Sequence, residues 1–571
     1  MDIKANSFEF GDYYFGGIKS NLSYRTGSIY LKSLSGDLES TRFNGHLQVN
    51  LDKELITGDL QLPFFRMEDI QQAVIKKVDL KNRFLGSGSG RVSIATPFES
   101  DRMTFSLDAR LFKGTAFGED YNEAKLQAVA TEGQINIKKF HLLKEKSAFQ
   151  MKGKLDTKLN TELFFDIASG HLQHSTLLHK YNLPISGSFI ATGKITGKID
   201  SPNISTKAKV EELIFNKKNY GSAIFSYSNA DKQTSLQFNL PDRLDLLILL
   251  PEKDSSSFFI DLDAKKVDIA PIIGFLITQD STRSYLIETT GEISGHIDTA
   301  DFWNSEFSST IEEIAIDYKS NKITSSIPTN IELKNHKLFL NELSIKGPKQ
   351  YIKILQKETQ PYRTSFIING MMNISFFKLF APFIEKIDGF SSLRLELSLN
   401  RNDIELFGSS YTTNSFLKFP GFPHAFEELT ADLSFNQNKV LINSITGQFA
   451  GGKILGNGKI QFQGPKKYNL VINTDFEDAQ IHFPEGIHTN GSGSISLSGS
   501  GTPFKLAGNY RVKQGLIEKE LESSEKSASK NLLEDLLKEE VSTPMLLDID
   551  IIAENSIEVR NSLLAVSYTH L

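Results

Sequence analysis

The feature that most constrains the fold of this chain is a strand-like apolar pattern that returns about every hundred residues. It reads SIYLKSL at 28–34, QINIKKF at 134–140, KLFLNEL at 337–343 and KVLINSI at 439–445. From its second residue, each copy has the order apolar, any, apolar, any, any, apolar. The copies begin 106, 203 and 102 residues apart, and SLQFNLP at 235–241 stands near the place of a missing copy. A fixed long period predicts a supersecondary unit that stacks on copies of itself, and so an elongated surface rather than one catalytic cleft.

A second element recurs with a similar period. In it, Gly or another small residue alternates with Ile, Val or Leu, and a Pro or a polar turn closes the segment. The copies end at Pro97, Pro202, Ala300, Asn402 and Pro503. A period of two indicates strands with two unlike faces. Glycine at alternate positions also allows another backbone or a ligand to approach closely.

Short helices are expected between the strand blocks, at equivalent places in successive repeats: 67–78, 169–184, 268–277 and 375–387. Pro271 and Pro382 should shorten or break the last two. A longer amphipathic stretch, 524–541, carries four leucines on one stripe. It interrupts the strand pattern and is predicted to cap or plug one place along the assembly.

These patterns predict an all-β fold with a few short helices, built as an elongated repetitive antiparallel sheet. A long sheet must cover its apolar face. It should therefore curl into an open trough that is apolar within, or roll shut into a solenoid with a side-chain core. The repeats are expected at 1–84 (partial), 85–186, 187–286 (degenerate), 287–387 and 388–487, with a different domain beginning within 488–571. All are expected to stack as one continuous body.

Composition excludes several classes of protein. With 39% apolar residues and 42 Phe the chain is too apolar for disorder. Lys and Arg number 63 against 69 Asp and Glu, and no long run of one charge occurs, so the footprint of a nucleic-acid binder is missing. The absence of Cys excludes disulfides and thiolate chemistry. No stretch approaches the roughly 20 apolar residues of a membrane span, and no signal sequence opens the chain; we expect an anchoring segment outside this sequence.

Residues in catalytic or metal-binding patterns are not found. His171, His174 and His179 form a histidine cluster without an evident carboxylate ligand, and incidental surface histidines explain it better than a metal site. The glycine-rich segments 86–90 and 193–198 lack the spacing of a phosphate-binding loop. Acidic pairs are consecutive, so on strands their side chains would point to opposite faces. We therefore expect no enzyme, no metal site and no cofactor.

Several segments resemble a known family. FEELTADLSFNQNKVLINSITGQFAGGKILGNGKIQFQG at 426–464 and NGSGSISLSGSGTPFKLAGNYRVKQGLI at 490–517 are similar to the AsmA-like repeats of TamB-type proteins. LLDIDIIAENSIEVRNSLLAV at 546–566 resembles the start of the TamB C-terminal domain. The resemblance extends from about residue 7 to 566, and the order of the segments is more specific than any one of them.

The resemblance implies a long, U-shaped hydrophobic β-groove related to bridge-like lipid transfer proteins. Members lie in the periplasm of diderm bacteria, are anchored in the inner membrane by an N-terminal helix, and conduct phospholipids toward the outer membrane. TamB works with the outer-membrane barrel protein TamA. This sequence lacks the N-terminal anchor and stops just after the C-terminal domain begins, so we expect an internal fragment. The last residues, 567–571, break the alternation and are expected to be foreign to the native chain.

A phospholipid conduit needs an unbroken apolar lining, because exposing two acyl chains of about thirty methylenes to water costs on the order of 25 kcal/mol. Alternating aliphatic positions are the candidates for this lining: Ile29, Leu31, Ile135, Ile137, Ile195, Ile199, Ile293, Ile297, Leu338, Leu340, Val440, Ile442, Ile460, Phe462, Ile495 and Leu497. The competing interpretation is that these residues pack against one another as a dry protein core.

Two other functions fit the same pattern. An assembly factor for outer-membrane proteins would offer its strand edges to extended clients by β-augmentation. A closed structural solenoid, such as a surface adhesin, would fill its interior with its own side chains.

Overall fold

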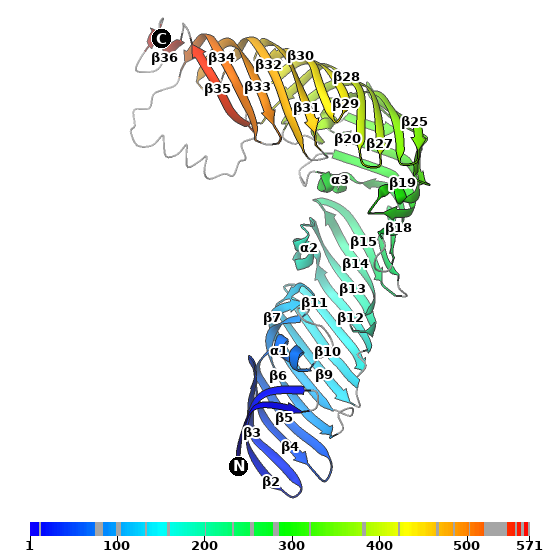
Figure 1. Ribbon diagram of the computed structural model, residues 1–571, viewed down its shortest axis with the longest axis vertical. Coiled ribbons are helices and arrows are strands. Elements are labelled where there is room, and N and C mark those ends of the chain that lie inside the picture. Colours follow the sequence, from blue (N-terminus) through cyan, green and yellow to red (C-terminus); the bar gives the residue numbers. More distant parts are fainter. Residues whose placement is uncertain are drawn as a thin grey trace. The chain divides into compact units, whose positions relative to one another are not determined.

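The fold was analysed in a computed structural model of the chain (Figure 1). The structure describes residues 1–10, 13–74, 84–98, 104–131, 134–156, 160–199, 201–230, 233–251, 256–277, 285–318, 321–379, 384–420, 423–463, 467–482, 486–501, 503–518, 545–553, 557–560 and 565–568. The chain divides into two compact units, Met1–Lys265 and Lys266–Leu571, called here the first and the second unit. Each is described by itself.

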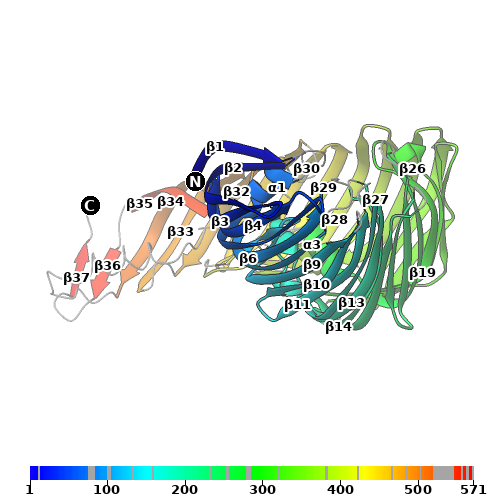
Figure 2. The same cartoon turned by 90° about the horizontal axis from the view of Figure 1, so that it is seen from below.

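The first unit is a meander of strands with three short helical segments. Its strands are β1 (Asp2–Phe10), β2 (Tyr13–Arg25), β3 (Ser28–Leu38), β4 (Thr41–Asn50), β5 (Leu55–Arg66), β6 (Phe84–Pro97), β7 (Phe105–Ala116), β8 (Glu119–Tyr121), β9 (Glu123–Thr131), β10 (Gln134–Lys144), β11 (Ser147–Asp156), β12 (Asn160–His171), β13 (Ile185–Lys198), β14 (Asn203–Phe215), β15 (Lys218–Ser228), β16 (Thr234–Leu240), β17 (Leu244–Leu250) and most of β18 (Ser257–Asp268). The helical segments are α1 (Met67–Val74), η2 (Leu172–His174) and α2 (Thr176–Lys180). Figure 2 shows these strands curving rather than lying flat.

The second unit repeats this architecture. Its strands are β19 (Tyr285–Asp298), β20 (Glu306–Tyr318), β21 (Asn321–Ser325), β22 (Thr329–Lys334), β23 (Lys337–Leu340), β24 (Glu342–Gly347), β25 (Gln350–Gln360), β26 (Arg363–Asn373), β27 (Lys386–Asn400), β28 (Ile404–Lys418), β29 (Phe426–Gln437), β30 (Lys439–Phe449), β31 (Gly452–Phe462), β32 (Tyr468–Ile481), β33 (Ile487–Gly499), β34 (Phe504–Ile517), β35 (Met545–Ala553), β36 (Ile557–Arg560) and β37 (Ala565–Tyr568). Its helical segments are α3 (Ala270–Ile277), η3 (Phe302–Asn304) and η4 (Ile374–Leu379).

The predicted all-β fold and antiparallel pairing are confirmed. Successive strands pair as antiparallel neighbours, as in β13 with β14 and β32 with β33. Several of the two-residue connections have positive φ at both residues, for example Thr26 and Gly27 (40° and 68°) or Asn216 and Lys217 (47° and 69°). Such turns match the twist of the flanking strands and keep the hairpins tight. One departure is that β34 pairs in parallel with β35 and β36.

The recurring apolar pattern marks a β-bulge as well as a strand. The pairing register shifts between Leu31 and Leu34 in β3, and between Ile137 and Phe140 in β10. It shifts likewise between Ile442 and Ile445 in β30. A bulge inserts one extra residue and bends the strand, so a three-residue step returns the apolar side chain to its original face. The repeat therefore encodes the bend of the sheet together with its apolar face.

Glycines in the strands lie against phenylalanine rings of neighbouring strands. Gly36 pairs with Phe43, and Gly170 pairs with Phe189. A Cβ atom added to Gly170 would lie 2.4 Å from Phe189 Cζ. At these positions the group that approaches the glycine closely is an aromatic ring of the protein itself, an arrangement that compensates for the poor packing of glycine in strands.

Helical segments α1, α2, α3 and η4 occur where the sequence places them, each before a glycine-alternating strand, whereas η3 was not predicted. The predicted residues 75–78 lie outside the described residues. α1 packs Met67 and Ile70 against the sheet, and its Asp69 Oδ2 accepts hydrogen bonds from Ser40 N (3.0 Å) and Thr41 Oγ1 (2.8 Å). In α3, Pro271 lies in the first turn, where a missing N–H leaves the helix intact.

The predictions for 169–184 and 375–387 were wrong in extent. In the former only η2 and the short α2 are helical. In the latter η4 ends at Leu379, and β27 already begins at Lys386. The strand begins at Lys386 because this residue and Ile387 already pair with β28. The amphipathic stretch 524–541 lies outside the described residues; Ser567 and Tyr568 lie in β37, paired with β36.

α2 is held to the sheet by Glu119 of β8. The carboxylate accepts hydrogen bonds from Lys144 Nζ (2.6 Å), Ser175 Oγ (2.5 Å), Thr176 N (3.0 Å) and Leu177 N (3.0 Å). Burial raises the pKa of Glu119, but the hydrogen bonds from Lys144, Ser175 and the two amides outweigh it, so the pKa lies below its ordinary value. Because the pKa is lowered in the folded chain, the stabilisation is present above the unfolded pKa and is lost as the pH falls through the folded one.

The first prediction concerns this carboxylate. Glu119→Gln should lower the melting temperature at pH 7, and the difference from the unmodified chain should shrink as the pH falls below about 4, where free carboxyls protonate. Thermal unfolding between pH 7 and 3 measures it. An equal difference at every pH would contradict the assignment.

The second prediction tests the glycine–phenylalanine pairs. Gly170→Ala should destabilise the first unit by about 1–3 kcal/mol, because its new methyl group overlaps the Phe189 ring. Adding Phe189→Leu should recover part of that loss. The control is Gly515→Ala, where the nearest atom to an added Cβ lies at an ordinary 3.4 Å. Equal destabilisation by Gly170→Ala and Gly515→Ala in denaturant titrations would contradict the account.

Candidate apolar binding groove

In the first unit, strand registers align uncharged residues into rows that cross the strands. One row runs through β5, β6, β7, β9, β10, β11, β12, β13 and β14: Leu60, Val92, Leu107, Ala128, Ile137, Gly153, Leu163, Ile195 and Ile204. Each is the direct partner of the next. The face of the sheet that carries this row is called the apolar face.

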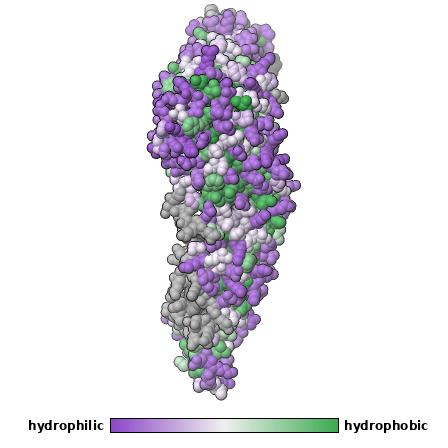
Figure 3. All heavy atoms as spheres, turned by 90° about the vertical axis from the view of Figure 1, so that its right-hand side faces the viewer, coloured by the Kyte–Doolittle hydropathy of each residue, from purple (hydrophilic) through white to green (hydrophobic). Residues whose placement is uncertain are grey.

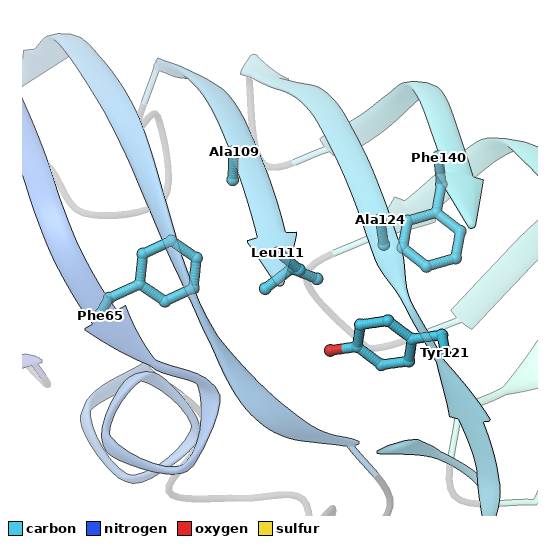
Figure 4. Close-up of a cluster of buried hydrophobic side chains, with 6 residues drawn as sticks. All are labelled: Phe65, Ala109, Leu111, Tyr121, Ala124 and Phe140. Carbon is cyan, nitrogen blue, oxygen red and sulfur yellow. The ribbon is translucent and has the colours of Figure 1, made fainter. Parts of the chain in front are cut away.

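A cluster of buried side chains packs on one part of this face. Phe65, Ala109, Leu111, Tyr121, Ala124 and Phe140 form a cluster on one side of their strands, close to α1 (Figure 4). The Tyr121 hydroxyl donates to Leu85 O (3.2 Å). Burial, and then the charge of Glu68, raises the pKa of Tyr121. The cluster therefore contains a polar atom but no charge.

The second unit has an equivalent row. It crosses β24 to β34 through Ile345, Ile352, Gly370, Leu393, Ser410, Leu433, Ile442, Gly458, Ile472, Leu497 and Leu506. Ser410, its polar member, is buried, and its hydroxyl forms a hydrogen bond with that of Ser391 (2.6 Å). A hydroxyl satisfied in this way adds little polarity to the face.

A cavity of about 110 Å³ opens on the apolar face of the second unit. Its lining is apolar except for one threonine: Leu417, Phe419, Phe426, Leu429, Ile445, Ile454, Ile472, Thr474, Ile495, Leu497 and Leu506. Two glycines of β31 adjoin it, since Gly456 pairs with Ile445 and Thr474, and Gly458 pairs with Ile472. Their missing side chains leave room above the sheet, and the cavity is as large as several water molecules.

A ladder of aromatic rings borders this cavity. Phe426 stacks on Phe449 with ring centres 4.9 Å apart. Phe449 meets Phe476 edge to face at 5.9 Å, and Phe476 lies 5.8 Å from Tyr510. The Tyr510 hydroxyl donates to Thr489 Oγ1 (2.9 Å), and burial raises its pKa. The ladder is a rigid wall that presents no ionised group.

The opposite face of the sheet carries the charges. In β31 and β32, the exposed Lys453, Lys459, Asp475 and Glu477 alternate with residues of the apolar face. Ion pairs at the surface, such as Lys194 with Glu162 (3.2 Å), link neighbouring strands. The side of the molecule drawn in Figure 3 is mainly hydrophilic, with hydrophobic patches between. Each strand is thus amphipathic, as period-two alternation requires.

The pairing registers place the predicted lining residues of the strands on the apolar face of one unit or the other, whereas Ile199 lies in the turn after β13. Ile29, Leu31, Ile135, Ile137 and Ile195 lie in β3, β10 and β13 of the first unit. In the second unit, Ile293, Ile297, Leu338, Leu340, Val440, Ile442, Ile460, Phe462, Ile495 and Leu497 lie in β19, β23, β30, β31 and β33. Leu338 and Ile442 are buried, Phe462 is 40% exposed, and the others are half-buried. Lipid contact at these residues stays a prediction.

Of the lining residues predicted from the sequence, only Ile495 and Leu497 line the cavity. Sequence reasoning missed the aromatic ladder, because the rings come from four different strands, β29, β30, β32 and β34, whose pairing registers are not visible in the sequence. One signal in the sequence could have indicated the cavity. Ile454 stands two residues before Gly456, and the alternating run that contains both residues ends at Ile460.

The predicted histidine cluster does not converge on one point. His171 and His174 stack at 5.4 Å, His174 Nδ1 lies 2.9 Å from Glu145 Oε2, and His179 Nε2 contacts Gln173 O. In the part of the chain that the structure describes, no three His, Asp or Glu side chains are grouped as metal ligands. Nor does any helix there have the length and apolarity needed to cross a membrane.

Comparison with known families gives one match. Residues 443–569 match the model of the TamB C-terminal domain. The match confirms the resemblance to TamB-type proteins and supports a role in a translocation and assembly module. Among curated proteins no match is found.

A matched pair of variants on β33 tests which face binds apolar molecules. Leu497→Asp places a charge in the cavity, whereas Ser496→Asp places it on the opposite face. Binding of N-phenylnaphthylamine, followed by its fluorescence, should weaken about tenfold in the first variant and stay unchanged in the second, because an apolar site does not solvate a carboxylate. Equal binding by both variants would show that the cavity is not the binding site.

Proposed function

We propose that this chain, whose residues 443–569 match the TamB C-terminal domain, is a non-enzymatic conduit for phospholipids in the periplasm of a diderm bacterium. The acyl chains lie on the apolar face, and the headgroups stay solvated along the open side of the groove. In this proposal the protein is held at the inner membrane and delivers lipid to a TamA-type outer-membrane barrel. The observation that carries the proposal is the uncharged row that crosses consecutive strands in each unit.

The dimensions of the rows suit an acyl chain. Neighbouring strands lie about 4.8 Å apart, so the row from Leu60 to Ile204 is roughly 40 Å long. One leaflet of a bilayer core is only about 15 Å thick. An acyl chain on the row therefore contacts aliphatic side chains over its whole length, and can advance by one strand without meeting a charge.

The energetics favour movement along the groove over escape. Exposing both chains of a phospholipid to water costs on the order of 25 kcal/mol. A step from one strand to the next exchanges one set of aliphatic contacts for a similar set. The barrier to sliding is thus much smaller than the cost of leaving. No energy source is built into this mechanism, so direction comes from the partners at either membrane.

Assembly of outer-membrane proteins is the second candidate, and β35 favours it. Leu546, Leu547, Ile551 and Ile552 are exposed, and among the described strands β35 pairs only with β34. An exposed apolar edge strand can pair with an extended client. The open sheet of each unit gives no support to the third candidate, a closed structural solenoid.

Photo-crosslinking separates the first two candidates. A photoreactive residue at Ile195 or Ile442, both on the apolar face, should give phospholipid adducts in cells. Controls at Lys194 and Leu441, the adjacent residues on the opposite face, should give none. Protein adducts without lipid at Ile195 and Ile442 would overturn the conduit and support the assembly factor.

A further inference from the structure

Three histidines gather at one end of the strands that line the cavity of the second unit. His424 precedes β29, His482 follows β32, and His488 lies in β33. The ring centres of His424 and His482 are 5.8 Å apart, and those of His482 and His488 are 4.6 Å apart. His424 Nε2 accepts a hydrogen bond from the backbone N–H of His482 (2.8 Å). This bond ties the segment before β29 to the end of β32.

The histidines are connected to the cavity through aromatic contacts. The ring of His424 meets Phe449 edge to face at 5.9 Å, and Phe449 stacks on Phe426. Phe426 and Phe419 line the cavity. An amphiphile whose chain fills the cavity therefore has its polar end within reach of this end of the strands.

The exposure of the three imidazoles suits contact with a solvated group. His482 and His488 are exposed, whereas His424 is half-buried. Burial, and then the neighbouring His482, lowers the pKa of His424, which favours the neutral ring whose Nε2 accepts the hydrogen bond from His482 N. Protonating clustered imidazoles is unfavourable without a counter-ion, and a bound anion removes that penalty.

The charged groups around the histidines do not prevent an anion from binding to them. Among the described residues, Glu518, after β34, pairs with the cluster, and its Oε2 lies at a long 3.9 Å from His488 Nε2. Lys513 of β34 and Asp478 of β32 are paired with each other (2.5 Å). Glu427 and Glu428 of β29 are exposed, and Glu428 accepts a hydrogen bond from Gln448.

We propose that His424, His482 and His488 form a binding site, called here the station, for the phosphate of a lipid whose acyl chain occupies the cavity. This inference rests on the proposed function, because it assumes that the apolar face holds acyl chains. It gives the lipid a preferred binding position in a groove whose rows are otherwise uniform. It also predicts that lipids with net negative charge bind more tightly there than zwitterionic ones.

The station should depend on pH. Because an anion beside an imidazole favours the protonated form of the ring, binding of an anionic headgroup is coupled to proton uptake and should strengthen as the pH falls from 8 to 6. The contribution of the apolar cavity does not change. A headgroup without net charge should show little of this dependence.

Binding of two lysolipids with the same twelve-carbon chain tests the station, with lysophosphatidylglycerol as the anion and lysophosphatidylcholine as its zwitterionic control. Isothermal titration of the whole chain below the critical micelle concentrations, at pH 6 and pH 8, should show the anionic lipid binding about fivefold more tightly at pH 6. The exposed pair His482→Gln/His488→Gln should lose that gain but still bind the zwitterionic lipid. Glycerol 3-phosphate, which has no chain, should not compete.

The outcomes separate this inference from the proposed function. Tighter binding of the anionic lipid at pH 6 that the histidine variant loses supports the station. Equal binding of both lipids at both pH values contradicts the phosphate-binding role of the histidines but leaves the proposed groove intact. Failure of either lipid to bind overturns the groove and the station together. Competition by glycerol 3-phosphate overturns the lipid assignment, because it shows that the histidines bind a free phosphate ester.

Discussion

Keeping charged side chains off one face of a bent sheet is the constraint on which this structure depends. A flat strand does so by simple alternation, but a strand that bends must absorb an extra residue. In β3, β10 and β30 the bulge falls between the second and third apolar residues of the pattern, so the face is preserved on both sides of it. The uncharged rows that cross many strands exist because strands that bulge, such as β3, β10 and β30, keep their apolar face, while others, such as β31 and β32, pair without a shift. Without this correction, one half of a bulged strand would turn its charged side chains toward the apolar face.

Much of this was predictable from the sequence, and the remainder has identifiable physical causes. Repetition and alternation predicted the all-β fold and the face on which Ile137 and Ile442 lie, because a period of two depends on local sequence alone. The bulge was hidden in the same pattern: the step from Ile442 to Ile445 was interpreted as part of a strand rather than as a change of register. Short helices such as η4 were overestimated, since their ends depend on where the next strand begins to pair. The cavity was missed because it depends on side chains from several strands, and pairing registers are not visible in a single segment.

Glycine and phenylalanine divide the apolar face into two kinds of surface. Where a ring covers a glycine, as Phe189 covers Gly170, the face is closed by the protein itself. Where glycines stand beside aliphatic residues, as Gly456 and Gly458 do in β31, the face is hollow, and an apolar cavity opens. The conduit interpretation assigns the hollow parts to acyl chains. The histidines at one end of the hollow then supply the polar group that an amphiphile requires.

The most direct test of this account uses the absence of cysteine from the chain. Single cysteines carrying spin labels along β30, measured against a lipid-borne relaxation agent in the presence of phospholipid, report which side chains contact lipid. The account predicts strong contact at 440, 442, 445 and 447 and weak contact at 441, 443, 444 and 446, so that the alternation changes phase at the bulge. Uniform contact along the strand, or contact confined to the charged face, would contradict it.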